Sequence, residues 1–166
     1  RNGINHQIPV QTSFNLFKYF NINPSFNYQE RWYFQKVDKE WDPVAKQVID
    51  SDTTWGFYRL YNYSMSVSAS TKVYGTYQFK KGAAIQAIRH MITPSVSFSY
   101  TPDFGKNGYG YYKQVQSDTM GRMMTYSPFA NGLYGVPGSG PSMSLNFSVS
   151  QTLEMKVRDK KDTTGV

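Results

Sequence analysis

The sequence predicts an all-β protein in which an antiparallel meander of about five long strands forms part of the wall of a transmembrane β-barrel. Three observations lead to this fold class: apolar and polar residues alternate over long stretches, charged residues avoid those stretches, and the connections alternate between short and long. Successive side chains of a strand point to opposite faces, so the alternation gives each strand one apolar and one polar face.

The alternation predicts five strands. They cover approximately residues 8–17, 20–35, 57–77, 88–102 and 142–157. Strands of globular proteins mostly have about 3–10 residues, whereas a tilted membrane strand needs about 9–11 residues to cross the hydrocarbon. The second and third predicted strands exceed both lengths, which favours strands that extend beyond a bilayer.

The polar face of the last three strands consists mainly of serine and asparagine. We expect this face to line a hydrated lumen, and its members are Asn62, Ser64, Ser66, Ser68, Ser70, Ser95, Ser97, Ser99, Ser144, Asn146 and Ser148. We expect the opposite face to meet lipid through Met65, Val67, Val96, Phe98, Tyr100, Leu145, Phe147 and Val149.

Charged residues are almost absent from the centres of the predicted strands. The windows 8–17, 20–35, 57–73, 91–102 and 141–153 contain only Glu30, Arg31, Arg59 and Lys72. The solvent face of a soluble sheet normally carries lysine and glutamate, so an uncharged polar face favours a barrel lumen. Aromatic residues gather near the strand ends in "RWYF", "WGFYRLYNY" and "VYGTY", as in the interfacial girdles of membrane barrels.

The connections are sorted by length. Short connections around "KYF" and "FKKGAAIQA" alternate with long ones over about 36–56 and 103–140. Membrane barrels have short periplasmic turns and longer extracellular loops. We therefore expect 36–56 and 103–140 to be extracellular loops, and residues 1–166 to be a fragment of one outer-membrane barrel domain.

Three prolines, Pro24, Pro94 and Pro102, lie within or at the edge of the predicted strands. Proline has no backbone N–H to donate to a sheet ladder. Each therefore predicts either a bulge or strand end, or a place where strand pairing is weakened for function.

The sequence offers little for catalysis. It has 166 residues and no cysteine, which excludes a thiolate nucleophile, a thiolate metal site and a disulfide framework. The two histidines, His6 and His90, have no second ligand at metal spacing. The net charge of +7 is spread over the connections and does not favour a dedicated nucleic-acid surface. We expect no enzyme activity, no cofactor, no metal and no nucleic-acid partner.

One stretch, "AIRHMITPSVSFSYTPDF", is more specific than the alternation. It resembles the barrel domain of the LPS-assembly outer-membrane protein (LptD) family, in the form found in Bacteroidota. The residues that carry the motif are Arg89, His90, Thr93, Pro94, Ser95, Tyr100, Pro102, Asp103 and Phe104. The stretches "HQIPVQTSFNLFKYFNINPSFNYQERWY" and "SLNFSVSQTLEMKV" resemble the neighbouring strands, although Gln151 stands near a position where the family usually has asparagine.

The resemblance implies an integral outer-membrane protein that receives lipopolysaccharide from a periplasmic bridge and delivers it to the outer leaflet, without making or breaking a bond. It also implies an LptE-like lipoprotein plug as partner. The chain would be a central part of the barrel, without the periplasmic jellyroll domain and the first and last barrel strands. Two alternatives stay open: another outer-membrane porin or channel barrel, or a secreted β-sandwich adhesin.

Overall fold

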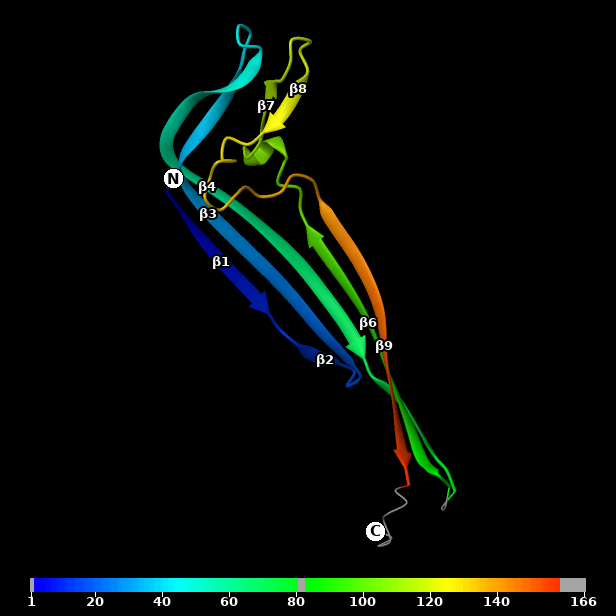
Figure 1. The fold of residues 1–166 in the computed structure, drawn as a ribbon. Helices are drawn as coiled ribbons and strands as arrows, with labels where there is room; N and C mark the ends of the chain where they lie inside the picture. Colours follow the sequence, from blue (N-terminus) through cyan, green and yellow to red (C-terminus); the bar gives the residue numbers. More distant parts are fainter. Residues whose placement is uncertain (1, 81–82, 159–166) are drawn as a thin grey trace. The chain divides into compact units, whose positions relative to one another are not determined.

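The computed structural model describes residues 2–80 and 83–158, so the other residues of the expected fragment 1–166 lie outside the described part. It confirms an all-β protein built from an antiparallel meander of long strands (Figure 1). The elements are β1 (Gly3–Gln11), β2 (Phe14–Leu16), β3 (Phe20–Asp42), β4 (Gln47–Thr71), β5 (Val73–Gln78), β6 (Ile85–Thr101), the 3-10 turn η1 (Asn107–Tyr109), β7 (Lys113–Gln116), β8 (Met123–Tyr126) and β9 (Ser142–Val157).

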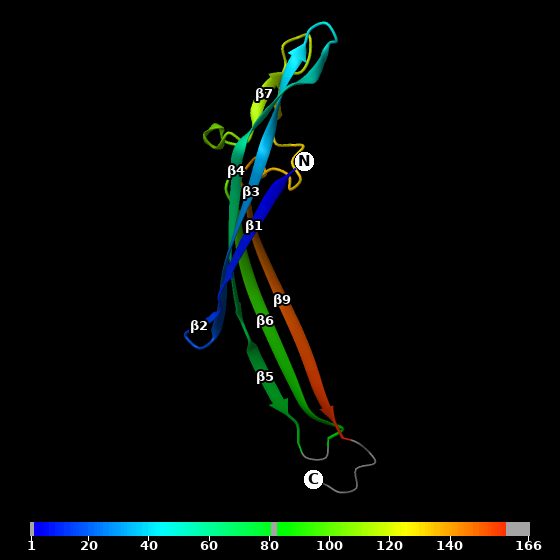
Figure 2. The same ribbon diagram turned by 90° about the vertical axis from the view of Figure 1, so that its left-hand side faces the viewer.

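The main sheet has the strand order β1-β3-β4-β6-β5, with β2 also paired to β3 and β9 also paired to β6 (Figure 2). Strands β7 and β8 form a separate two-stranded sheet. In the described ranges 2–80 and 83–158, no helix is long and apolar enough to cross a membrane.

The chain divides into two compact units. The first contains Arg1–Gln11, Ser25–Ser66 and Ser99–Ser144, and the second contains Thr12–Pro24, Val67–Phe98 and Leu145–Val166. The long strands β3, β4, β6 and β9 contribute residues to both units.

The predicted first strand begins earlier and is interrupted. Strand β1 starts at Gly3, and the chain leaves regular structure at Thr12 and Ser13 before β2. Thr12 donates its backbone N–H to the carbonyl of Pro24, at 3.2 Å, and the proline has no N–H to return. Pro24 therefore marks a defect in the ladder.

Residues 17–19 join β2 to β3 in a tight turn. Phe17 and Lys18 both have positive φ, of 50° and 67°, and Tyr19 donates its N–H to the carbonyl of Leu16. Two central residues with positive φ are typical of the tight turns that match the twist of a hairpin. The predicted short connection is therefore present.

The predicted third strand is divided into β4 and β5 at Lys72. The register of β5 with β6 pairs Val73 with Ile92, and its continuation brings Thr71 level with Pro94. Because Pro94 cannot donate to the ladder, the strand is interrupted at this level.

The structure corrects the expectation that 36–56 is a loop. Strand β3 continues to Asp42 and β4 begins at Gln47, so most of this region is a hairpin. The Asp42 Oδ1 atom accepts the backbone N–H groups of Val44 and Ala45, which closes the turn. Lys39 and Asp50 pair across the hairpin at 3.6 Å. This hairpin has a turn closed by a carboxylate and an ion pair between its strands. It lacks the alternation of apolar and polar residues from which the other strands were predicted.

The region 103–140, which was also expected to be a loop, contains regular secondary structure. It contains η1 and the β7–β8 hairpin, in which Lys113 pairs with Tyr126. Asp118 accepts the N–H groups of Met120 and Arg122 with one carboxylate oxygen, which fixes the hairpin turn.

The buried core of the first unit lies between this segment and the main sheet. Tyr33 and Leu60 are only 2% and 1% exposed, and both come from strands. Phe104, Tyr111 and Phe129 complete the cluster from residues 103–140. These residues are far apart in the sequence, so the cluster depends on the chain returning to the sheet.

Candidate functional site

On the serine-rich face, pairs of hydroxyls form hydrogen bonds between neighbouring strands. In the first unit Ser25 and Ser66 share a hydrogen bond of 2.6 Å, and Ser99 and Ser144 share one of 2.7 Å. In the second unit Ser95 and Ser148 share one of 2.6 Å. The structure therefore brings several of the predicted residues together in pairs. We call the face formed by the predicted serines and asparagines the hydroxyl face.

Alternation assigns the remaining predicted residues to the same face of their strands. In β4 these are Asn62, Ser64, Ser68 and Ser70; in β6 and β9 they are Ser97 and Asn146. Ser25 and neighbouring Asn27 of β3, which were not predicted, extend this face. Their signal was present in the alternation of residues 20–35.

A buried arginine interrupts the hydroxyl face in the first unit. Arg31 is 8% exposed and donates to Asn62 Oδ1 at 2.6 Å, Gln29 Oε1 at 2.7 Å and the carbonyl of Tyr134 at 3.0 Å. All three acceptors are uncharged. Because these contacts come from two strands and from residues 103–140, Arg31 joins the segment to the sheet.

Part of the segment 103–140, which we call the covering segment, lies against the hydroxyl face. The ring of Phe129 stacks on Tyr33 with centroids 6.0 Å apart. The Tyr33 hydroxyl donates to the carbonyl of Gly135 and accepts the N–H of Tyr134. This contact could not be predicted, because the covering segment has no alternation that specifies a partner.

The covering segment also satisfies backbone groups at two strands. The Tyr111 hydroxyl accepts the N–H of Tyr61 in β4 at 2.8 Å and donates to the carbonyl of the same residue. On β3, Val37 donates to the carbonyl of Pro128 and Lys39 donates to the Tyr126 hydroxyl. The segment thus bonds to strand backbone that is otherwise available to another strand.

A further ion pair fixes the β7–β8 hairpin to β3. Lys113 Nζ lies 2.6 Å from Asp38 Oδ1, and Lys36 lies on the other carboxylate oxygen at 3.4 Å. The hydrogen bond from Lys113 holds the pKa of the Asp38 carboxyl below its ordinary value. The hairpin is therefore attached to β3 by an ion pair as well as by the hydrogen bond to the Tyr126 hydroxyl.

The family-motif residues divide into two groups. At the exit of β6, Asp103 Oδ1 accepts the N–H groups of Gly105 at 2.8 Å and Gly140 at 2.7 Å, so one carboxylate ties together both ends of the covering segment. Phe104 is 1% exposed and packs edge-on against Tyr63. This part of the motif closes the base of the segment, and Pro102 immediately precedes it.

The other motif residues lie in the second unit. Arg89 pairs with Glu154 at 3.7 Å and its guanidinium lies over the Tyr74 ring. His90 shares a hydrogen bond with Gln151, the position that departs from the usual family residue. Thr93 and Pro94 lie on β6 at the level where β4 and β5 separate.

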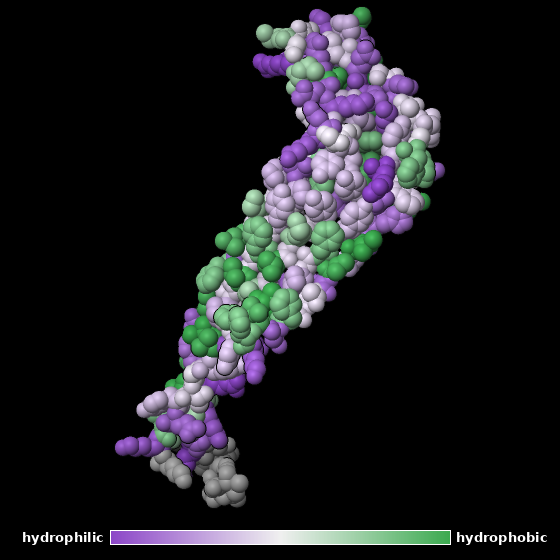
Figure 3. Space-filling model, turned by 180° about the vertical axis from the view of Figure 1, so that it is seen from behind, coloured by the Kyte–Doolittle hydropathy of each residue, from purple (hydrophilic) through white to green (hydrophobic). Residues whose placement is uncertain are grey.

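The apolar face is largely exposed. Leu145 and Phe147 are 72% and 73% exposed, and Met65, Val67, Val96, Phe98 and Val149 are exposed as well. Tyr100 is partly covered. Figure 3 shows hydrophobic side chains gathered over the middle of the face that it draws. Large exposed apolar patches mark contacts with proteins or membranes.

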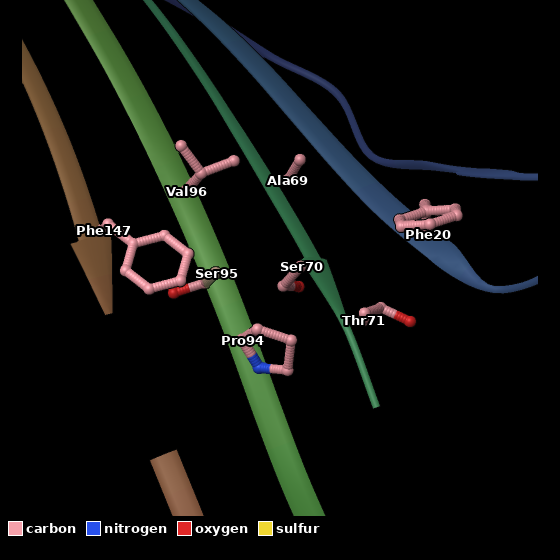
Figure 4. A pocket seen from close by; sticks show the side chains of 8 residues that line it. All are labelled: Phe20, Ala69, Ser70, Thr71, Pro94, Ser95, Val96 and Phe147. Atoms are coloured by element: carbon pink, nitrogen blue, oxygen red, sulfur yellow. The ribbon is translucent and has the colours of Figure 1, made fainter. Parts of the chain in front are cut away.

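An apolar hollow of about 150 Å³ lies on this face of the second unit (Figure 4). Phe20 and Phe147 flank the smaller Ala69 and Pro94, and Val96 lies beside them. The small side chains leave room between the two rings. The described residues that line the hollow are all uncharged.

The chemistry of the described part of the chain does not include a metal cluster. Within residues 2–80 and 83–158, no three histidine, aspartate or glutamate side chains are grouped so that they could hold a metal ion. The arrangement instead offers hydroxyls and amides on one face and hydrocarbon on the other.

Comparison with known proteins identifies the family to which the chain belongs. The family model described as LptD protein matches residues 1–165, almost the whole chain. Neither the curated proteins nor the solved structures gave a match. The chain therefore belongs to the LptD family, whose members are outer-membrane proteins that act in lipopolysaccharide transport.

Proposed function

We propose that this chain forms a central part of the barrel wall of a Bacteroidota-type LptD protein, which moves lipopolysaccharide through the outer membrane and assembles it into the outer leaflet. One observation carries the proposal: strands of an LptD-family chain expose hydrocarbon on one face and uncharged hydroxyls on the other. The hydroxyl face looks into the hydrated lumen and the apolar face meets lipid.

The exposed apolar side chains support the lipid assignment. Side chains such as Leu145 and Phe147 would each be unfavourable in water, because exposed apolar surface costs about 25 cal/mol per Å². Contact with the hydrocarbon of the bilayer removes this cost. The hollow between Phe20 and Phe147 has the apolar lining that suits the acyl chain of a membrane lipid.

The hydroxyl face supports the transport assignment. Its serine and asparagine side chains donate and accept hydrogen bonds, so they can replace water around sugar hydroxyls. They carry no formal charge, so they do not hold phosphate groups as strongly as a cationic wall would. Passage along such a wall breaks no bond, and we infer that the chain has no enzymatic role.

The partners follow from the same assignment. Lipopolysaccharide is the substrate at the level of the family. We infer that an LptE-like lipoprotein plug and the periplasmic bridge proteins are the partners of the complete protein. We also infer that the 36–56 hairpin and the covering segment lie on the extracellular side, where the covering segment narrows the lumen.

Two neighbouring positions of β6 test which face meets lipid. Val96→Arg should impair barrel assembly in the complete protein, by about 2–4 kcal/mol if the position is near the bilayer midplane. Ser97→Arg introduces the same side chain on the opposite face and should be better tolerated. The measurement is the amount of heat-modifiable barrel in outer membranes. Equal tolerance at both positions would refute the lipid assignment.

A further inference from the structure

A row of polar side chains crosses the apolar face of the first unit. His6 of β1 is paired in register with Glu30 of β3, and Glu30 forms an ion pair with Arg59 of β4, with Oε1 and Nε 3.0 Å apart. By alternation, Ile8 and Phe26 share this face with them. A charged pair is unusual among hydrocarbon side chains, so its position needs a physical reason.

The carboxylate of Glu30 has several hydrogen-bond partners. It accepts hydrogen bonds from the Tyr28 hydroxyl and from Trp32 Nε1, the latter at 2.6 Å, in addition to the Arg59 contact. Its side chain is only 15% exposed, whereas that of Arg59 is 54% exposed. The Glu30 carboxylate is therefore mostly covered, whereas the Arg59 guanidinium is exposed.

Arg59 keeps donors for another partner. A guanidinium has five N–H donors. Its contacts with Glu30 and with the Tyr28 hydroxyl, at 3.3 Å from Nη2, engage only part of them. The guanidinium also lies over the Tyr61 ring, 5.2 Å from the centroid, which orients it.

Aromatic rings frame the row. His6 packs edge-on against Trp32 at 4.5 Å between centroids, and Trp32 packs edge-on against Phe57 at 5.5 Å. Trp55 and Phe57 are exposed. Tryptophan, whose ring is amphipathic, is enriched where membrane hydrocarbon meets the headgroup layer.

The row also stands at the end of charge-free stretches. Residues 20–29 of β3 and 60–71 of β4 contain no charged side chain. Each stretch has about the length of 9–11 residues that a tilted strand needs to cross the hydrocarbon. Glu30 and Arg59 are thus the first charges at one boundary of both stretches.

We propose that Arg59 binds the phosphate group of a membrane lipid at the outer surface of the barrel, with Glu30 as the residue that positions its guanidinium. The proposal rests on the proposed function, because it requires the apolar face to meet lipid. Arginine donors form short, charge-assisted bonds to phosphate. The phosphate belongs to a glycerophospholipid headgroup or to the lipid A part of lipopolysaccharide, which share this chemistry.

The test uses the complete protein in detergent with two lipid pairs. One pair is phosphatidylglycerol against the uncharged diacylglycerol, and the other is lipid A against lipid A without its phosphates. The lipid retained after purification is quantified by mass spectrometry. We expect Arg59→Gln to lower the preference for the phosphorylated member by about two- to fivefold, the size of one exposed charge interaction, in at least one pair. Arg59→Lys should keep most of the preference, because it keeps the cation.

Arg122→Gln is the matched control. Arg122 is also exposed and pairs with an acidic side chain, Asp118, at 3.5 Å, but it lies in the turn of the β7–β8 hairpin and not on the apolar face. This variant should retain the wild-type preference. Loss in the phosphatidylglycerol pair assigns the glycerophospholipid, and loss in the lipid A pair alone assigns lipid A. A wild-type preference of Arg59→Gln in both pairs overturns the proposal.

A second measurement separates this inference from the proposed function. A fluorophore is attached at Phe98→Cys in a cysteine-free variant of the complete protein, which is reconstituted with lipids brominated on their acyl chains. Quenching shows that the apolar face meets hydrocarbon, so a null result with Arg59→Gln would then reject only the phosphate site. Absence of quenching would reject both.

Discussion

At the scale of single residues, the motif that resembled the family has a clear structural role. Asp103 bonds to backbone groups at both ends of the covering segment, and the adjacent Phe104 is inserted into the core of the first unit. The resemblance pointed to these positions, but it could not say that one carboxylate closes a segment that ends at Gly140.

The base of the covering segment should be sensitive to acid. The backbone N–H groups of Gly140 and Gly105 hold the pKa of the Asp103 carboxyl below its ordinary value. A group with a lowered folded pKa contributes stability that is present above the unfolded value, about 3.9, and is lost as the pH falls through the folded value. After correction for intrinsic rates, hydrogen exchange at Gly140 should be constant from about pH 7 to 5 and increase below about pH 4. Asp103→Asn should remove this dependence; an unchanged dependence would contradict the assignment.

Gly132 is a second position at which one atom decides the packing. A Cβ at this position would lie 2.5 Å from Tyr33 Cζ and 2.9 Å from the carbonyl oxygen of Phe129. Because Tyr33 is buried, Gly132→Ala should destabilise the covering segment by about 1–3 kcal/mol. Limited proteolysis of the complete protein measures this loss. Gly138→Ala is the control, since a Cβ there meets nothing within 4 Å, and equal susceptibility of the two variants would be evidence against this packing.

At the scale of elements, alternation identified strands that have an uncharged centre. The fifth predicted strand, 142–157, has the bounds of β9, and the fourth corresponds closely to β6. It did not identify the extension of β3 and β4 into the region 36–56, because charges and a turn at Asp42 stabilise that hairpin. It also could not join β4 to the covering segment, which depends on hydrogen bonds to the backbone.

The Tyr111 hydroxyl provides a test of that joint. Tyr111→Phe removes the acceptor of the Tyr61 N–H and should cost about 1–3 kcal/mol, the penalty of an unsatisfied buried donor. Hydrogen exchange at the Tyr61 amide should therefore become faster. Tyr109→Phe is the matched control, because the Tyr109 ring lies in the same cluster while its hydroxyl has no hydrogen bond among the described residues. Equal exchange in the two variants would show that the Tyr111 hydroxyl does not protect the strand.

At the scale of the whole molecule, the sequence by itself determined the all-β meander, the division of each long strand into an apolar and a hydroxyl face, and membership of the LptD family. These properties follow from a local period of two and from a motif that is continuous in the chain. Only the tertiary structure decided that Arg31 contacts Tyr134, that part of the covering segment lies on the hydroxyl face, and that Glu30 pairs with Arg59. Such contacts join residues from separate strands and connections, and their free energy depends on distances that appear only when the chain has folded back on itself.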